Sequence, residues 1–424
     1  FTFNLVDTLF ISMLGTEPLS AISFTFPVTF MVLSMAIGLG IGTSAVVAKY
    51  LGRDEFEKAK QASTVTNYTA ILMAMALSAV GYVFMDDIFR LMGANENLLP
   101  QIREYMTIWL PTSFLLVGMN SANSVLRASG DTKTPSLIMA GAGLVNAILD
   151  PVFIFGFGPV PAMGIQGAAV ATLISWLVAF VYIYYYLIVK VELVYPGIPS
   201  LANFRNSSRE MLRIGIPASG ANMLTPVAAG VMTAIAATYG ESTVAAFGVG
   251  SRIESIACLV VLALSSTLPP FISQNLGAGR ADRIADSYRL AMKFIIAWQL
   301  VIYAVLALSA KLIARVFTQD EEVSRAIELF IWILPLGYGL QGVIILTNSA
   351  FNALHKPMMA LYLSIARFFI FYVPIAWIGS QMFGLPGFYA GAMIGNMLMA
   401  LLSWRSFERT LKEDAQLVLG GQVP

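Results

Sequence analysis

Apolar residues run through this chain in long stretches that carry no charge, and short polar segments separate the stretches. One stretch of 39 uncharged residues lies between Asp150 and Lys190, and another of 31 lies between Glu17 and Lys49. About 20 apolar residues in a helix cross the ~30 Å hydrocarbon core of a bilayer. The pattern therefore predicts an all-α membrane protein that crosses the bilayer many times.

Charged residues and turn residues divide the chain into twelve candidate transmembrane helices. We expect these spans at residues 1–14, 20–48, 62–85, 104–126, 135–156, 165–189, 214–239, 244–276, 290–310, 328–352, 358–379 and 386–404. Two further segments, 92–103 and 316–327, have the composition of short amphipathic linkers.

The second half of the sequence repeats the first at an offset of 225 residues. Leu51-Gly52 recurs as Leu276-Gly277, and Asn123-Ser124 recurs as Asn348-Ser349. Internal duplication of a membrane protein is typical of transporters whose two halves move about a central site. Each repeat holds six spans, an even number, so both copies enter the membrane in the same direction. We expect two six-helix lobes related by a pseudo-twofold axis along the membrane normal.

These boundaries predict four parts of the chain. An N-terminal lobe covers 1–190, a cytoplasmic linker 191–213, a C-terminal lobe 214–410 and a cytoplasmic tail 411–424. The sequence opens with Phe1, and the first apolar run is short for a span. We interpret the N-terminus, including part of the first helix, as truncated.

The distribution of basic residues predicts the orientation. Of the 25 Lys and Arg residues, 18 fall in the tail and in the loops that follow even-numbered spans, and five fall in the other loops. Cytoplasmic loops carry the excess of basic residues. Both termini are therefore expected in the cytoplasm, in a multi-pass protein of the cytoplasmic (inner) membrane.

Composition excludes several classes of function. The net charge of +1 gives no case for nucleic-acid binding. One cysteine and one histidine exclude an intrachain disulfide, a cysteine-based metal site and a histidine proton relay. We expect a monomer in the lipid bilayer with no bound cofactor other than a coupling ion, H⁺ or Na⁺.

Ionisable residues inside predicted spans are the strongest functional signal. There are five of them: Asp7, Asp150, Arg252, Glu254 and Arg367. A charged side chain at the centre of a bilayer costs about 2.5–3.5 kcal/mol even on the most lenient insertion scale. Each of these residues therefore needs a partner or a function.

The two aspartates are candidates for ion coupling. Asn146 and Asp150 share one face of the fifth span, since they are four residues apart. Pro151 follows and frees the carbonyl of Ala147, because proline has no amide hydrogen. Such oxygens can hold a proton or a small cation, whereas the alternative is packing between helices. Asp7 has no charged neighbour in sequence, so its charged form is costly in hydrocarbon.

The other three charges have structural interpretations as well as functional ones. Arg252 and Glu254 are two positions apart, so they point to different faces and pair poorly. They are a possible secondary site, or else an interhelical clamp or the lining of a periplasmic vestibule. Arg367 is expected to be structural or to reach toward the membrane surface.

Several motifs are similar to those of the multidrug and toxic compound extrusion (MATE) family, over essentially the whole chain. They are Val6-Asp7-Thr8, Leu126 to Thr132 (LRASGDT), Gly164 with Gly167-Ala168-Ala169, and Ile214-Gly215-Ile216-Pro217. Within this family the chain resembles the DinF-type branch, which carries an acidic and amide cluster in its N-terminal lobe. The matching positions are Asp7, Asn120, Asn146, Asp150 and Thr172.

The resemblance implies a V-shaped, two-lobed fold and export of drugs or toxins, often lipophilic cations, driven by inward proton or sodium flow. It also implies that protonation of Asp7 bends the first helix. We favour the proton, because it needs one carboxylate, whereas sodium needs several oxygens; a sodium site would use Asp7 and Asp150. The alternatives are a lipid-linked saccharide flippase of the same superfamily, an ion channel and an intramembrane aspartyl protease. No enzyme activity is expected.

Overall fold

The molecule consists of helices that form two compact units. The computed structural model describes residues 7, 9–197, 201–318 and 320–419. The first unit covers residues 1–219 and the second covers residues 220–424. The boundary between them falls inside one long helix, α8 (Leu201–Ala237).

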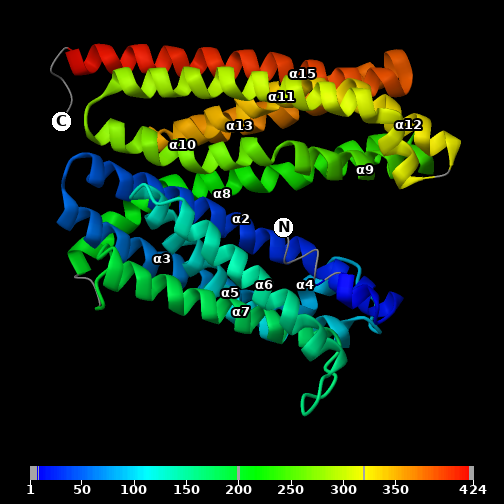
Figure 1. Ribbon diagram of the computed structural model, residues 1–424, viewed down its shortest axis with the longest axis horizontal. Coiled ribbons are helices and arrows are strands. Elements are labelled where there is room, and N and C mark those ends of the chain that lie inside the picture. Colours follow the sequence, from blue (N-terminus) through cyan, green and yellow to red (C-terminus); the bar gives the residue numbers. More distant parts are fainter. Residues whose placement is uncertain (1–6, 8, 198–200, 319, 420–424) are drawn as a thin grey trace. The chain divides into compact units, whose positions relative to one another are not determined.

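The first unit is a bundle of long helices (Figure 1), and its described residues form one hydrophobic core. After a helical segment that includes Asp7 and residues 9–12, its elements are α2 (Thr16–Gly52), α3 (Phe56–Val83), α4 (Met85–Leu91), α5 (Leu99–Ala128), α6 (Lys133–Phe155), α7 (Ile165–Tyr185), the π-helix η1 (Tyr186–Lys190) and the first part of α8. Helix α2 packs against α3 and α5, and α6 packs against α7.

The second unit has the same kind of architecture. It contains the rest of α8, then α9 (Glu241–Ala257), α10 (Leu259–Gly277), α11 (Ala281–Phe317), α12 (Glu321–Ile333), the 3₁₀ turn η2 (Leu334–Gly337), α13 (Tyr338–Ala353), α14 (Pro357–Ala366), the π-helix η3 (Arg367–Tyr372) and α15 (Val373–Leu419). Gly384 interrupts α15 with φ 64° and ψ −146°, so the chain forms two helices here. Only glycine adopts this conformation readily.

Nine helical stretches among the described residues are long and apolar enough to cross a membrane. The last of them, 357–413, contains the kink at Gly384 and so accounts for two of the twelve predicted spans. Two other predicted spans are the segment that carries Asp7, described only in part, and α5. These helices agree with the predicted all-α fold.

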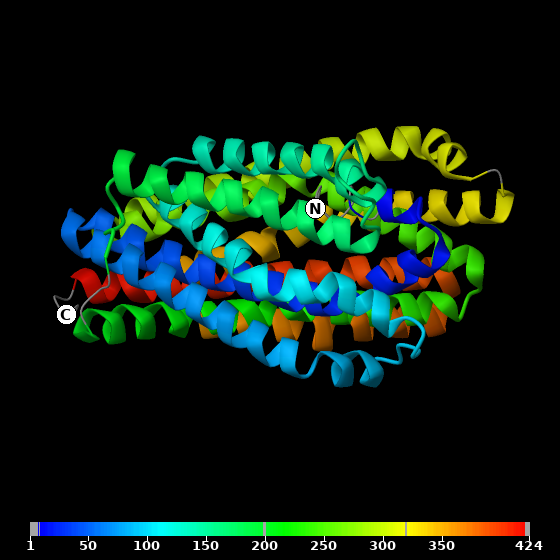
Figure 2. The same ribbon diagram turned by 90° about the horizontal axis from the view of Figure 1, so that it is seen from below.

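Helix α5 is less apolar than its neighbours, and other helices of the first unit pack around it. It packs against α2, α3 and α7, and its ribbon runs beside that of α2 in both views (Figures 1 and 2). Its buried polar residues include Ser121, Asn123 and Ser124. The Trp109 side chain of α5 meets Trp176 of α7 edge to face, with ring centroids 5.8 Å apart.

The ends of the helices repeat at the same offset as the sequence. Helices α2 and α10 end at Gly52 and Gly277, α3 and α11 begin at Phe56 and Ala281, and α5 and α13 end at Ala128 and Ala353. Each pair is 225 residues apart. The duplication therefore extends from residue identities to the points at which the helices start and stop.

The structure differs from the sequence prediction at some helix ends. Helix α5 begins at Leu99, inside the expected linker 92–103, because Pro100 suits the first turn of a helix. Helix α12 begins inside the expected linker 316–327, where the Asp320 carboxylate accepts hydrogen bonds from two backbone amides of its first turn. Helix α8 begins at Leu201, so part of the expected linker 191–213 is helical.

The expected span 244–276 is divided at Cys258 into α9 and α10. The side chain of Gln299 donates a hydrogen bond of 2.9 Å to the carbonyl oxygen of Ala257 at this break. A side-chain donor therefore occupies a carbonyl at the point where the helix bends.

Candidate functional site

Four polar side chains from three segments of the first unit form one buried hydrogen-bonded network. Thr172 of α7 donates from Oγ1 to Oδ2 of Asp7 at 3.3 Å. The amide nitrogen of Asn146, on α6, donates to Thr172 Oγ1 at 3.4 Å and to Asp150 Oδ1 at 3.2 Å. All four residues are at least 96% buried. Two carboxyl groups from different parts of the chain are thus bridged by one amide and one hydroxyl.

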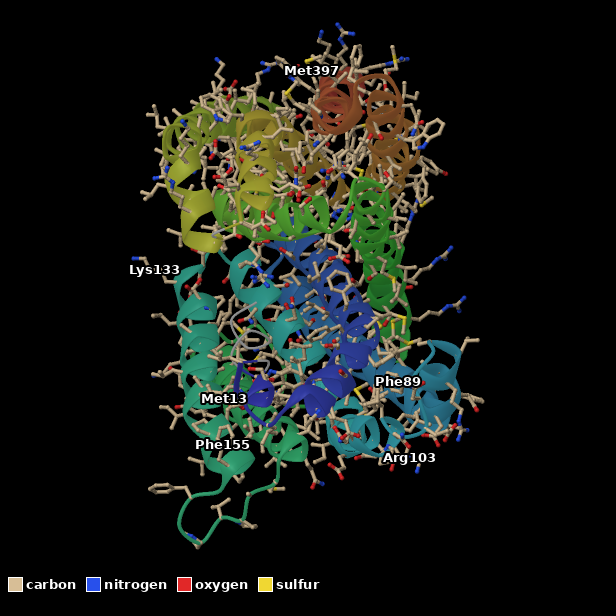
Figure 3. The ribbon with its side chains drawn as sticks, turned by 90° about the vertical axis from the view of Figure 1, so that its right-hand side faces the viewer. Met13, Phe89, Arg103, Lys133, Phe155 and Met397 are labelled. Atoms are coloured by element: carbon tan, nitrogen blue, oxygen red, sulfur yellow. The ribbon has the colours of Figure 1, made fainter. Side chains whose placement is uncertain are left out.

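Local packing brings these segments together. Gly167 allows α7 to approach α6, because a Cβ atom at this position would lie 2.4 Å from the carbonyl oxygen of Phe153. Phe155, at the end of α6 (Figure 3), packs edge to face against Phe10, with ring centroids 6.3 Å apart. Phe10 lies less than one turn after Asp7, so this contact holds the Asp7 segment beside α6.

The network has more acceptors than donors. The hydroxyl hydrogen of Thr172 and the two amide hydrogens of Asn146 are all used in the three hydrogen bonds. Asp7 Oδ1, Asn146 Oδ1 and Asp150 Oδ2 are buried and have no hydrogen-bond partner. A buried acceptor without a donor is costly. These three oxygens are therefore suited to a group that supplies positive charge.

A proton or a small cation could supply that charge. Two carboxylates that share a buried site repel each other, so one proton in the cluster removes a large penalty. A hard metal cation is typically held by six or more oxygens. The described residues contain no group of three or more His, Cys, Asp or Glu side chains that could hold a metal ion.

One predicted site residue lies outside this network, and one residue without a predicted role lies near it. The side-chain oxygen of Asn120, on α5, lies against Gly40 of α2, and the three hydrogen bonds above do not reach it. Tyr105, also on α5, is 96% buried and within electrostatic range of both Asp7 and Asp150. The sequence gives no sign that an uncharged tyrosine on an apolar helix lies near the acidic pair.

Two of the intramembrane charges of the second unit, Glu254 and Arg367, make hydrogen bonds within that unit. Gln341 of α13 donates a 2.7 Å hydrogen bond to the Glu254 carboxylate, and buried Arg367 donates to Asn396 at 3.3 Å. The Arg367 guanidinium also lies over the ring of its neighbour Phe368, 4.8 Å from the centroid. The structural role of Arg367 stays a prediction.

Arg252 differs from the other intramembrane charges because its side chain is exposed. It lies on α9 eleven residues after Glu241, which is about 16 Å along the helix. No hydrogen bond or ion pair joins it to another residue in the described part of the chain. The second unit also lacks the acidic pair: at an offset of 225 residues, buried Met232 stands in place of Asp7.

Comparison with known proteins identifies the family. The MatE family model matches residues 1–152 and 217–378, which is more than half of the chain and includes both repeats. The chain is a MATE transporter. Members of this family are transporters and not enzymes, so the intramembrane protease alternative is wrong.

Curated relatives of this MATE transporter differ in the substrates that their names state. It is 40% identical over 407 residues to the FAD transporter of Shewanella oneidensis, which covers 96% of this chain and 90% of the relative. It is 29% identical over 394 residues to the probable multidrug resistance protein YpnP of Bacillus subtilis (91% and 86%). It is 23% identical over 403 residues to the multidrug export protein MepA of Staphylococcus haemolyticus (95% and 88%).

Solved structures show the same fold. The Vibrio cholerae MATE transporter VcmN in its bent form has a TM-score of 0.92 at 32% identity, covering 97% of this chain and 93% of that chain. A MOP superfamily transporter from Pyrococcus furiosus has a TM-score of 0.87 at 28% identity, covering 97% and 91%. The predicted multi-pass, two-lobed fold with twelve spans is confirmed.

Proposed function

We propose that this MATE transporter is a proton-coupled exporter of the cytoplasmic membrane, with Asp7, Thr172, Asn146 and Asp150 as its coupling site. The observation that carries the proposal is the bridged carboxyl pair with three buried oxygens that have no hydrogen-bond partner. The location in the N-terminal half agrees with the resemblance to DinF-type transporters. Glu254 and Arg252 are not part of this site.

The proposed cycle depends on binding and release of a proton by the acidic pair, Asp7 and Asp150. With a proton on one carboxyl group, the pair carries a single negative charge and the cluster is stable in a dry site. When the site opens to water, hydration stabilises a second carboxylate, and the proton can leave. Thr172 and Asn146 connect the two carboxyl groups, so a change at one of them is transmitted to the other.

Transport in proteoliposomes tests the coupling ion. We expect export to follow an imposed proton gradient at fixed sodium, and Asp7→Asn to abolish it while the protein still purifies in a folded form. Glu254→Gln is the matched control, since it removes a carboxylate from a span of the second unit. Export that follows a sodium gradient after the proton gradient is collapsed would contradict proton coupling and assign the carboxylates to a metal site.

The relatives support two candidate substrates. We infer that FAD or a similar flavin nucleotide comes first, because the Shewanella oneidensis FAD transporter shares 40% of residues over almost the whole chain. Arg252 is an exposed cation within a span, and an arginine of this kind would recognise the phosphate groups of such a substrate. Lipophilic drugs come second, on the 29% identity to YpnP and the 23% identity to MepA.

Uptake into everted vesicles distinguishes these substrates. We expect ATP-energised vesicles that contain this chain to accumulate FAD, and Arg252→Gln to reduce FAD uptake without reducing uptake of a cationic dye. Arg283→Gln, which removes an exposed arginine near the start of α11, is the control. Uptake of dye but not FAD would favour the multidrug function. The flippase alternative stays a prediction that these relatives do not favour.

A further inference from the structure

A groove along α8 is lined by both apolar and basic side chains. Its volume is about 820 Å³. Phe204, Leu212 and Ile216 supply apolar surface, and three arginines also line it: Arg205, Arg209 and Arg213. The arginines are four residues apart, so they follow one side of the helix. All of these residues belong to the first unit.

The three guanidinium groups carry uncompensated charge. Each arginine is exposed, and no hydrogen bond or ion pair connects any of the three to a described residue. The neighbouring carboxylate of Glu210 is engaged elsewhere: it accepts hydrogen bonds from Lys49 at 3.2 Å and from Tyr50 at 3.3 Å. This end of α8 therefore presents positive charge beside an apolar surface.

Contacts with α2 and α3 hold this part of α8 in place. Ser208, which also lines the groove, shares a 2.6 Å hydrogen bond with Thr69 of α3. Glu210 binds the end of α2 through Lys49 and Tyr50. The groove is thus part of a packed helix, and its ligand would meet a preformed surface.

The length of the uncharged part of α8 would place the arginines at the level of lipid headgroups. Residues 214–237 of α8 carry no charge and extend for about 36 Å, which is enough to cross the ~30 Å hydrocarbon core. The turns that bear the arginines occupy the preceding ~12 Å of the same helix. The apolar residues Leu212 and Ile216 lie where this segment enters the hydrocarbon region.

We propose that this groove binds an anionic phospholipid of the surrounding bilayer. The phosphate groups would lie against Arg205, Arg209 and Arg213, and an acyl chain would cover the apolar side chains of the groove. Basic side chains next to a span attract anionic lipids, and arginine can hold a phosphate through two parallel hydrogen bonds. The bound lipid would attach the start of α8 to the membrane surface.

Lipid retention by the purified full-length protein tests this proposal. The protein in neutral detergent is incubated with equal amounts of phosphatidylglycerol and phosphatidylcholine, and native mass spectrometry measures the lipid that stays bound. A basic residue at the surface contributes on the order of fivefold to binding of anionic lipid, so the three together contribute on the order of 100-fold. We expect phosphatidylglycerol to be retained preferentially.

Two triple variants separate this groove from general charge attraction. Changing Arg205, Arg209 and Arg213 to Gln should remove most of the retained phosphatidylglycerol. The matched control changes three exposed cations of the second unit to Gln, namely Arg283, Arg405 and Lys412, and should retain the lipid. If the first triple variant does not purify in a folded form, Arg209→Gln alone should reduce retention about fivefold.

Three outcomes would overturn the proposal. They are unchanged retention in the groove variant, equal loss in the two triple variants, and equal retention of both lipids by the unmodified protein. A fourth outcome with the same consequence is displacement of the lipid by added FAD, which would assign the groove to substrate. The measurement does not depend on transport, so failure of the proposed coupling site would leave the result unaffected.

Discussion

Thr172→Val should slow proton-driven export strongly while leaving the fold intact. Valine has nearly the same shape as threonine, but it cannot donate to Asp7 Oδ2 or accept from Asn146. A hydrogen bond to a charged group contributes about 1.5–3 kcal/mol, and each 1.36 kcal/mol is tenfold in rate. If this bond is needed in the rate-limiting state, the initial rate should fall roughly 10- to 150-fold.

The assay is the initial rate of export in proteoliposomes under a fixed proton gradient, normalised to the amount of folded protein. Thr172→Ser retains the hydroxyl group and should restore the rate to within about threefold, since the lost methyl group is a small packing change. Ser175→Ala is the matched control: Ser175 is buried one turn further along α7, and its hydroxyl group donates to the carbonyl of Ala171. A Thr172→Val protein with more than half the unmodified rate would refute the bridging role.

Three other changes test the site and the topology. Asn146→Ala and Asp150→Asn should each reduce export and should not reduce it further in combination, because both break the same network; rates that multiply would indicate separate contacts. Gly167→Val should abolish export by forcing α7 away from α6, whereas Gly141→Ala, with open space around it, should have little effect; normal export by the valine variant would contradict the close approach. A cysteine in place of Glu241, in a cysteine-free protein, should react with an impermeant thiol reagent outside intact cells; protection would reverse the predicted orientation.

The sequence alone predicted the fold class and part of the candidate site. Long uncharged stretches and the 225-residue repeat are properties of pattern, so they predicted the helical class and the duplication. Asp7 and Asp150 stood out because charges are rare in spans, and the structure places both in one network. Thr172 is uncharged and far along the chain, so only the family resemblance pointed to it.

The sequence could not predict contacts that depend on how the helices pack together. Tyr105 lies near the carboxyl pair because α5 is the central helix of its unit, and that arrangement is a tertiary property. Gln341 donates a hydrogen bond to Glu254 from another helix, and the two residues are 87 positions apart in the sequence. The start of α8 at Leu201 was not predicted, because the first turns of this helix are polar and resemble a loop. Hydrogen bonds to α2 and α3 stabilise these turns.

The acidic pair occurs in only one of the two repeats, and this asymmetry has an electrical consequence. One cluster that exchanges one proton per cycle would make export of a singly charged cation electroneutral. Export of FAD, with about two negative charges on its diphosphate, would instead move about three charges in the direction favoured by a negative cell interior. Each charge gains about 2.3 kcal/mol per 100 mV, so the membrane potential would contribute about 7 kcal/mol to FAD export at 100 mV.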